Sequence, residues 1–297
     1  IGTNGFDWVP TTLIPCHNIR LFQESWWTWT GFNGQISTAP LLRDDQDYDR
    51  YLSKAKVEDR EVVFCVNKIP DWFKQNDGSP EWADQRFQSQ VMSSTDPRSY
   101  IEASKYVWQM VARYGKVRFD ENLLNVRQQP RWNGDPVTIP KSGLNLINYF
   151  ELENEPDRPW KSNKYKYTPE ECAAFISAIY DGHEGMLGPF CGSMAADPTV
   201  KLVLPGLSDF DIQYIDRMDA WFKANRRDKK FPKIVFNFHH YCNIGNPNPP
   251  AIGGNLINGA GQSPENDRLP YRLKNMNQYL KQKFGSDIEI WYSEFGY

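Results

Sequence analysis

Two glutamates could do chemistry together, because each follows an apolar, strand-like run and precedes a chain breaker. Glu155 comes directly before Pro156, after the run 149–152. Glu294 lies two residues before Gly296, after the run 288–292. A pair of carboxylates can cleave a glycosidic bond, with one as proton donor and the other as nucleophile or base. The fold must first bring these two groups together, since they are 139 positions apart (294 − 155).

The elements that would position them alternate along the chain. The first strand and a turn are expected within 1–10, and further strands at 18–22, 61–66, 144–152, 200–204, 234–238 and 288–292. The expected helices are 47–57, 100–114, 168–179, 210–226 and 271–284. Strands that alternate with helices imply a parallel sheet. Seven such units without a linker or repeat are typical of a single α/β domain, the (β/α)8 TIM barrel. The strand ends of that barrel open onto one face, where active sites are built.

The sequence accounts for most, but not all, of the strands of such a barrel. We expect residues 1–297 to form one barrel domain. A closed barrel needs eight strands, and only seven are found in the sequence. We therefore expect the eighth strand beyond Tyr297, with possible further domains, and an open seam between the first and seventh strands.

Composition excludes several classes of protein. The net charge is −3 with acids and bases well mixed, which argues against a nucleic-acid partner because such a partner needs a basic face. No apolar run approaches the roughly 18 residues of a membrane span. Hydrophobic residues make up 40% and charged residues 24%, as in globular proteins.

The five cysteines fit no zinc motif. An odd number leaves at least one unpaired. Cys172 and Cys191 are the pair that we expect to form a disulfide, if any does. The chain begins at Ile1 without a signal sequence, so either a leader was removed or the sequence starts inside a longer protein. Cysteine usage does not decide the compartment, and we expect a secreted, periplasmic or cell-surface location.

With these motifs in place, the chain resembles the clan A glycoside hydrolases, (β/α)8 retaining enzymes that include families 5 and 39. In that clan the acid/base is the Glu of an Asn-Glu-Pro at strand 4, and the nucleophile is a strand 7 Glu, often in Glu-Phe-Gly. The resemblance covers essentially the whole chain but assigns no family. It implies Glu155 as acid/base, Glu294 as nucleophile, a carbohydrate substrate and no cofactor.

Four further residues match the clan pattern. Arg20 matches the strand 2 arginine that keeps the nucleophile ionised, although it could instead lie over the barrel rim. His239 and Tyr241 match a His-x-Tyr at strand 6. Alternation along a strand places both on one face, where Tyr241 would donate to Glu294 and His239 would contact substrate or nucleophile. Asn154 would bond a sugar hydroxyl.

Extra acids accompany the strand 4 motif. Glu151 and Glu153 share the parity of Glu155 if the strand continues. An unpaired interior carboxylate is costly, so we expect one of them to pair with Arg20 or another buried base.

Aromatic residues in expected loops suit the apolar faces of sugar rings. Trp72 follows strand 3 and Trp27 follows strand 2, so either could form the wall of a sugar subsite, although packing under a loop is at least as plausible for each.

Two other functions remain open. The first is a non-catalytic carbohydrate-binding or scaffold protein that keeps the barrel, since fold does not fix function. The second is a metal-dependent hydrolase that uses His239 and His240. No third ligand at suitable spacing is evident, so no metal is predicted.

Overall fold

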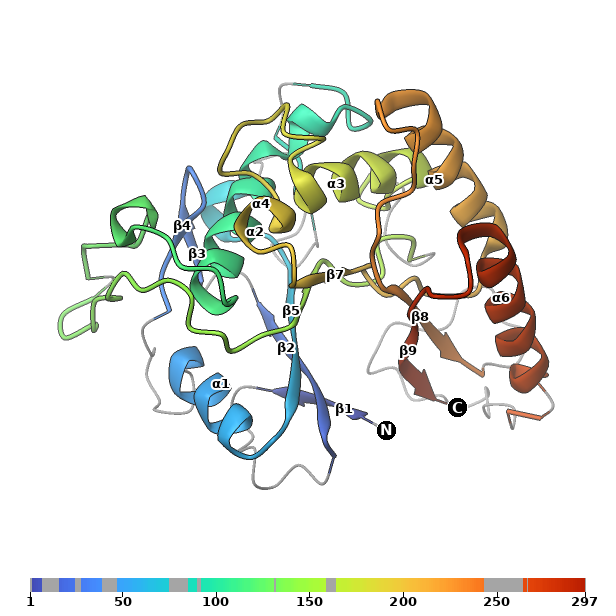
Figure 1. Ribbon diagram of the computed structural model, residues 1–297, viewed down its shortest axis with the longest axis horizontal. Helices are drawn as coiled ribbons and strands as arrows, with labels where there is room; N and C mark the ends of the chain where they lie inside the picture. Colours follow the sequence, from blue (N-terminus) through green and yellow to red (C-terminus); the bar gives the residue numbers. More distant parts are fainter. Residues whose placement is uncertain are drawn as a thin grey trace.

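The computed structural model (Figure 1) describes residues 2–6, 16–24, 28–38, 47–74, 85–89, 92–130, 132–158, 164–242, 264–265 and 267–296. In these residues, seven barrel strands run parallel to one another. They are β1 (Gly2–Phe6), β2 (Asn18–Glu24), β5 (Glu61–Asn67), β6 (Tyr149–Leu152), β7 (Lys201–Val203), β8 (Phe236–Tyr241) and β9 (Ile290–Gly296).

Strands that follow one another in the chain also lie side by side in space. β1, β2, β5, β6 and β7 form one sheet in that order, and β8 pairs with β9. Isolated parallel bridges from Val203 to Val235 and from Leu207 to Phe238 join the β7 segment to the β8 segment. Cα atoms of β1 and β9 approach within 8 Å, but no ladder joins these strands within the described residues. The predicted parallel α/β architecture is confirmed, and an eighth strand beyond Tyr297 stays a prediction.

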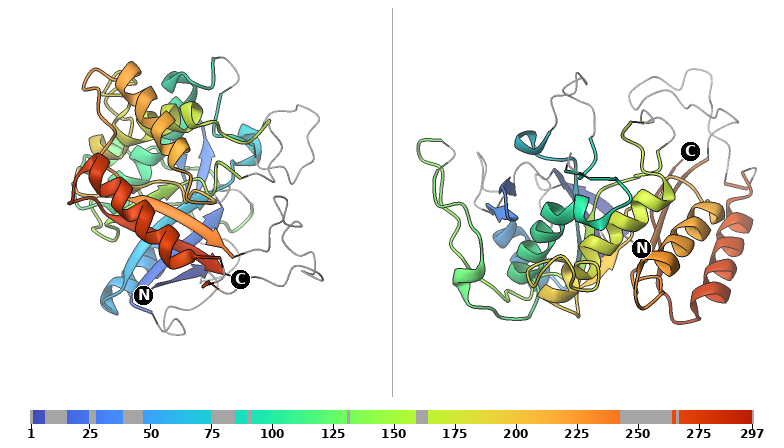
Figure 2. Two further views of the ribbon diagram at one scale, coloured as in Figure 1. Left: turned by 90° about the vertical axis from the view of Figure 1, so that its right-hand side faces the viewer. Right: turned by 90° about the horizontal axis from the view of Figure 1, so that it is seen from above.

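Helices connect the barrel strands. They are α1 (Tyr48–Val57), α2 (Ile101–Tyr114), α3 (Pro169–Asp181), α4 (Ser193–Ala196), α5 (Ile212–Asn225) and α6 (Leu269–Phe284). Figure 2 (right) shows α2, α3, α5 and α6 side by side in chain order. The start of α3 is fixed by a capping box, in which the Thr168 hydroxyl accepts from the Glu171 amide and the Glu171 carboxylate accepts from the Thr168 amide. None of the helices in the described ranges has the length and apolar character needed to cross a membrane.

A small hairpin that the sequence did not predict follows β2. It consists of β3 (Trp29–Gly31) and β4 (Gln35–Ile36), and Trp29 is fully buried beneath it, stacked on Tyr106 and Phe87. Three short 3₁₀ turns, η4 (Asp71–Phe73), η5 (Pro97–Tyr100) and η6 (Glu121–Leu123), lie in the connections that follow β5 and α2.

Three predicted strand boundaries were wrong. The fourth strand starts at Tyr149 rather than Leu144, because the amides of Leu144 and Leu146 bond to carbonyls of Arg113 and Tyr114 at the end of α2. β8 and β9 extend past their predicted ends, through Tyr241 and Gly296, because these segments pair with each other. Glu294 therefore lies within a strand rather than after one.

The expected disulfide is absent, because Cys172 and Cys191 are both free thiols. Cys172 lies in the first turn of α3, whereas Cys191 packs against Gly182 at the other end of that helix. Ten helical residues at 1.5 Å each place the two ends roughly 15 Å apart, well beyond the reach of a disulfide.

Candidate active site

Arg20 is the centre of a buried ionic network inside the barrel. From β2, its Nε lies 2.8 Å from Oε2 of Glu151 and its Nη2 lies 2.9 Å from Oε1 of the same carboxylate. Nη2 also donates to Oδ1 of Asn154 at 2.8 Å, and Nη1 donates to Oε1 of Glu294 at 2.7 Å. The guanidinium is 4% exposed. A two-pronged bond of this kind fixes orientation as well as charge, so Arg20 sets the position of Glu294 relative to β6.

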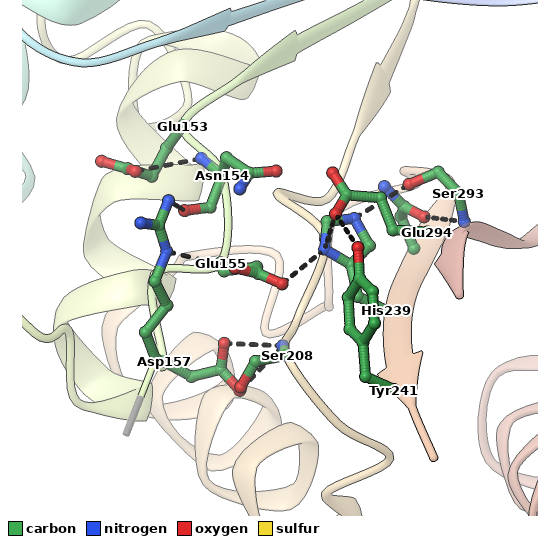
Figure 3. A network of polar contacts seen from close by, with 12 residues as sticks. Glu153, Asn154, Glu155, Asp157, Ser208, His239, Tyr241, Ser293 and Glu294 are labelled. Carbon is green, nitrogen blue, oxygen red and sulfur yellow. Dashed lines mark hydrogen bonds and ion pairs between the residues drawn. The ribbon is translucent and has the colours of Figure 1, made fainter. Parts of the chain in front are cut away.

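Glu294 is held from both sides. Its Oε1 accepts from Arg20. Its Oε2 accepts from the Tyr241 hydroxyl at 3.0 Å (Figure 3). Burial and the charge of Glu294 both raise the pKa of Tyr241, so the phenol remains a donor. Two donors to one carboxylate fix its orientation relative to the barrel interior.

Glu155 sits in a turn with an unusual backbone. The φ angles of Glu153 and Glu155 are 80° and 48°, in the left-handed region that non-glycine residues rarely adopt. Oε2 of Glu155 is 3.2 Å from Nε of Arg158, whose Nη2 donates to the Asn154 carbonyl. Such angles persist only where the surroundings enforce them, and they cluster at functional sites. This backbone turns the carboxylate of Glu155 toward β8.

His239 lies between the two carboxylates. Its Nδ1 is 3.0 Å from Oε1 of Glu155 and 3.7 Å from Oε2 of Glu294. The ring has no solvent exposure and packs so closely on Gly206 that a Cβ there would lie 2.0 Å from Nε2. Burial, followed by the charge of Arg20, lowers the pKa of His239 to about 4, so the imidazole is neutral near pH 7. It can therefore donate from only one nitrogen.

A β-bulge brings Ser293 to the same place. The register between β8 and β9 pairs Phe238 with Tyr292 but His239 with Glu294, so Ser293 is the extra residue. Its Oγ is 3.0 Å from Nε2 of His239, and both Ser293 and Glu294 consequently face the barrel interior (Figure 3).

Oxygen atoms of Glu155 and Glu294 and a nitrogen of His239 lie within 4.8 Å of one another. Here the carboxylate of Glu155, from the turn after β6, and that of Glu294, from β9, converge with a neutral imidazole, and Arg20 donates to Glu294. An arrangement of this kind can supply one proton donor and one ionised nucleophile at the same point.

A scan against protein-family models found no match, and a search of curated proteins found none either. Among solved structures, a GH30 endoxylanase from Clostridium papyrosolvens C71 is 12% identical, with a TM-score of 0.41 over 100% of this chain and 64% of that one. The likeness concerns the fold alone.

Two further structures are similar at the same level. A cellulase–inhibitor complex is 14% identical with a TM-score of 0.43, over 100% of this chain and 74% of that one. A putative α-L-fucosidase from Bacteroides thetaiotaomicron VPI-5482 is 11% identical with a TM-score of 0.33, over 98% and 84%. The chain thus spans less than two thirds of the endoxylanase chain and larger shares of the other two.

Simple alternation along a strand would place Glu151, Glu153 and Glu155 on one face, but their side chains point in different directions. Glu151 points to Arg20 and also accepts from the amide of Gly206 and from Nδ2 of Asn237. Glu153 instead accepts from the amide of Asn154, and its charge acts on Tyr167 at the start of α3. The strand ends at Leu152, and the left-handed backbone after it breaks the period-2 pattern.

Asn237 and Asp157 belong to the site but were missed. Asn237 shares the parity of His239 and Tyr241 on β8, so alternation could have identified it. Asp157 accepts from the amide and hydroxyl of Ser208, and burial raises its pKa to about 6 (Figure 3). No sequence signal links Asp157 to Ser208, which lies 51 positions away.

The tryptophans are less informative. Trp72 is partly buried and donates to the Trp29 carbonyl, and its ring packs edge-on against Trp29 and Phe32. It therefore supports the β3–β4 hairpin, and a role in binding sugar stays a prediction. Trp27 lies outside the described residues.

Proposed function

We propose that this protein is a retaining β-glycoside hydrolase, with Glu294 as nucleophile and Glu155 as general acid and base. The observation that supports this most is the approach of their carboxylate oxygens to within 4.8 Å. Retaining enzymes hold the two carboxyl groups about 5–5.5 Å apart, whereas inverting enzymes leave about 6.5–9.5 Å for a water molecule. The short separation favours double displacement on a poly- or oligosaccharide.

In the first step, an oxygen of Glu294 attacks the anomeric carbon and the bond to the leaving oxygen breaks. Glu155 gives its proton to that oxygen, so the products are a covalent glycosyl–enzyme ester and a free alcohol. Arg20 and Tyr241 hold Glu294 in the orientation for the attack, because both donate to its carboxylate.

In the second step, water attacks the same carbon and breaks the ester. The ionised Glu155 takes a proton from that water and returns to its starting form. His239 contacts Glu155 through Nδ1, so the imidazole would orient the acid/base rather than act on the sugar. No metal or organic cofactor is required by this chemistry.

The experiment is hydrolysis of a panel of aryl β-glycosides and oligosaccharides by the wild type, Glu294→Ala and Glu155→Ala. Glu294→Ala should abolish turnover. Glu155→Ala should retain turnover of substrates with acidic leaving groups. Added azide should speed this turnover, because it attacks the glycosyl–enzyme in place of water without needing a general base and releases a glycosyl azide. Binding of an oligosaccharide without turnover by the wild type would instead favour the carbohydrate-binding protein.

For an enzyme that acts on polysaccharide, we also propose a secreted, periplasmic or cell-surface location. Fractionation of the native cells, followed by detection with an antibody to this chain, tests it. Recovery in the cytosolic fraction alone would contradict it.

A further inference from the structure

Three potential metal ligands converge on the outer side of β8, away from the two carboxylates of the proposed reaction. The donor atoms of His240, Cys242 and Asp267 all lie within 4.8 Å of one another. His240 lies on β8 and Cys242 follows directly after the strand, so both lie opposite to His239 and Tyr241 if the alternation continues by one residue. Asp267 comes from the residues just before α6. The two adjacent histidines thus belong to separate clusters and cannot share an ion.

We propose that His240, Cys242 and Asp267 form a structural binding site for a divalent transition-metal ion of the zinc type. One imidazole, one thiolate and one carboxylate make up a donor set typical of zinc. Zinc bond lengths of about 2.0–2.3 Å place donor atoms roughly 3.5 Å apart. Nε2 of His240 and Oδ2 of Asp267, now 2.5 Å apart, would separate by about that difference, and Sγ of Cys242 already lies within 4.8 Å of the other two donor atoms. A water molecule would complete the tetrahedron.

The orientation of His240 supports this site independently. Its Nε2 faces Asp267, and its Nδ1 lies 3.1 Å from Oδ1 of Asp209. Histidines that bind metals almost always donate their second ring N–H to a carboxylate or carbonyl, which fixes the tautomer and the ring plane. Phe210 also stacks on the ring, with centroids 5.1 Å apart. Nε2 is therefore already aimed at the other two ligands.

Burial makes a chance grouping of these side chains less plausible. His240 and Cys242 are 5% and 1% exposed. The side chain of Asp267 is 13% exposed. Buried polar groups need partners, and an ion that binds three of them at once would satisfy them together.

Arg272 balances the charge of the cluster. Its Nη2 is 2.5 Å from Oδ1 of Asp209, and its Nη1 is 3.5 Å from Oδ2 of Asp267 and 3.4 Å from Nε2 of His240. A divalent ion would bind Nε2 of His240 and the Cys242 thiolate in place of protons, and Arg272 would offset part of the charge of the two aspartates. When an ion binds, Nη1 of Arg272 must move away from Nε2 of His240, whereas Nη2 can keep its hydrogen bond to Asp209.

A metal here would join the end of β8 to the start of α6. The strand segment it fixes carries His239 and Tyr241 on its other face, where both contact the proposed catalytic carboxylates. The ion would consequently stabilise the fold without touching substrate.

The test is zinc binding by the whole chain, measured by calorimetry and native mass spectrometry after removal of metal with a chelator. We expect one Zn²⁺ per chain and a higher melting temperature with zinc. Cobalt(II) in its place should give the intense near-ultraviolet absorption of a thiolate–cobalt bond. None of these readouts requires activity, so failure of this proposal is distinguishable from failure of the proposed hydrolase function.

Matched variants locate the ion. Cys242→Ser should remove the thiolate absorption and weaken binding, and Asp209→Asn should weaken it by about 10- to 100-fold through the orientation of His240. Cys191→Ser is the control, because that buried thiol bonds to the Leu187 carbonyl at the far end of α3 and should leave binding unchanged.

Three results would overturn the proposal. They are no stoichiometric zinc on the wild type, a cobalt spectrum without thiolate absorption, and binding that survives Cys242→Ser but is lost in Glu294→Gln. The last would place the ion between Glu155, His239 and Glu294 instead.

Discussion

Nη1 of Arg20 lies 2.7 Å from Oε1 of Glu294, although 274 positions separate the two residues in the chain. The same guanidinium is bonded twice to Glu151 on β6, so one side chain ties the second strand to the fourth and the seventh of the described barrel. The position of Glu294 therefore depends on Glu151 through the shared arginine.

Glu151→Gln tests this dependence. The change leaves Arg20 buried with one carboxylate fewer, and removal of one partner from a buried ion pair costs about 3–5 kcal/mol of unfolding free energy. Glutamine keeps one acceptor oxygen, so we expect the lower end of that range, with turnover reduced at least tenfold. Urea unfolding and kcat/KM on the best substrate measure the two effects.

The control for this change is Glu170→Gln. Glu170 forms an equally two-pronged pair with Arg217, but on the surface, where the arginine side chain is 58% exposed. Exposed pairs contribute about 0–1 kcal/mol. Equal losses of stability from the two substitutions would contradict the assigned role of Glu151.

Gly206→Ala should impair the site without changing any of its polar groups. The new Cβ would lie 2.0 Å from Nε2 of His239, in a place with no free volume. The imidazole must shift away from Glu155, and we expect kcat/KM to fall by about 100-fold, since small misplacements carry that cost. Gly31→Ala is the matched control, because there the added Cβ meets only the flexible Gln35 side chain. Full activity of Gly206→Ala would show that the position of His239 is unimportant.

Tyr241→Phe removes the donor to Oε2 of Glu294 and leaves the ring in place. A hydrogen bond to a charged group contributes about 1.5–3 kcal/mol, so kcat/KM should fall roughly 10- to 150-fold. The binding of an intact oligosaccharide to the Glu155→Ala background should change little, because the bond supports the nucleophile. Tyr271→Phe, at an exposed tyrosine on α6, should have no effect.

The pH dependence of stability provides a test of Asp157. Burial raises its pKa to about 6, above the ordinary value of 3.8, so the folded state binds this proton more tightly than the unfolded state does. The resulting stability is fully present below about pH 4 and is lost as pH rises through 6. Asp157→Asn lacks this loss, so its unfolding free energy relative to wild type should increase by about 3 kcal/mol between pH 4 and pH 7. A difference that does not vary with pH would show that Asp157 is not held in its neutral form.

The architecture was predictable because its signals are local. Alternating apolar runs and amphipathic segments, with caps such as Thr168, identify the strands and helices one at a time. Parity along β8 also separates His239 and Tyr241 from His240, and the contacts of the three side chains follow that division.

The features that were not predicted depend on interactions between segments that are distant in the sequence. The bulge that turns Ser293 inward exists only because β8 and β9 pair, and the left-handed backbone at Glu153 and Glu155 cancels the alternation that places acids on one face. Likewise, Asp267 meets His240 only because α6 starts beside the end of β8. The spacing of these residues along the chain does not predict this contact.

The most direct test is to trap the covalent intermediate. Wild-type protein would be incubated with 2-deoxy-2-fluoro glycosides that carry an activated leaving group, digested, and mapped by mass spectrometry. The account predicts a single glycosylated peptide, with the sugar on the carboxylate of Glu294 and no label in Glu294→Gln. A label on Glu155, or turnover of the parent substrate with inversion at the anomeric carbon, would contradict it.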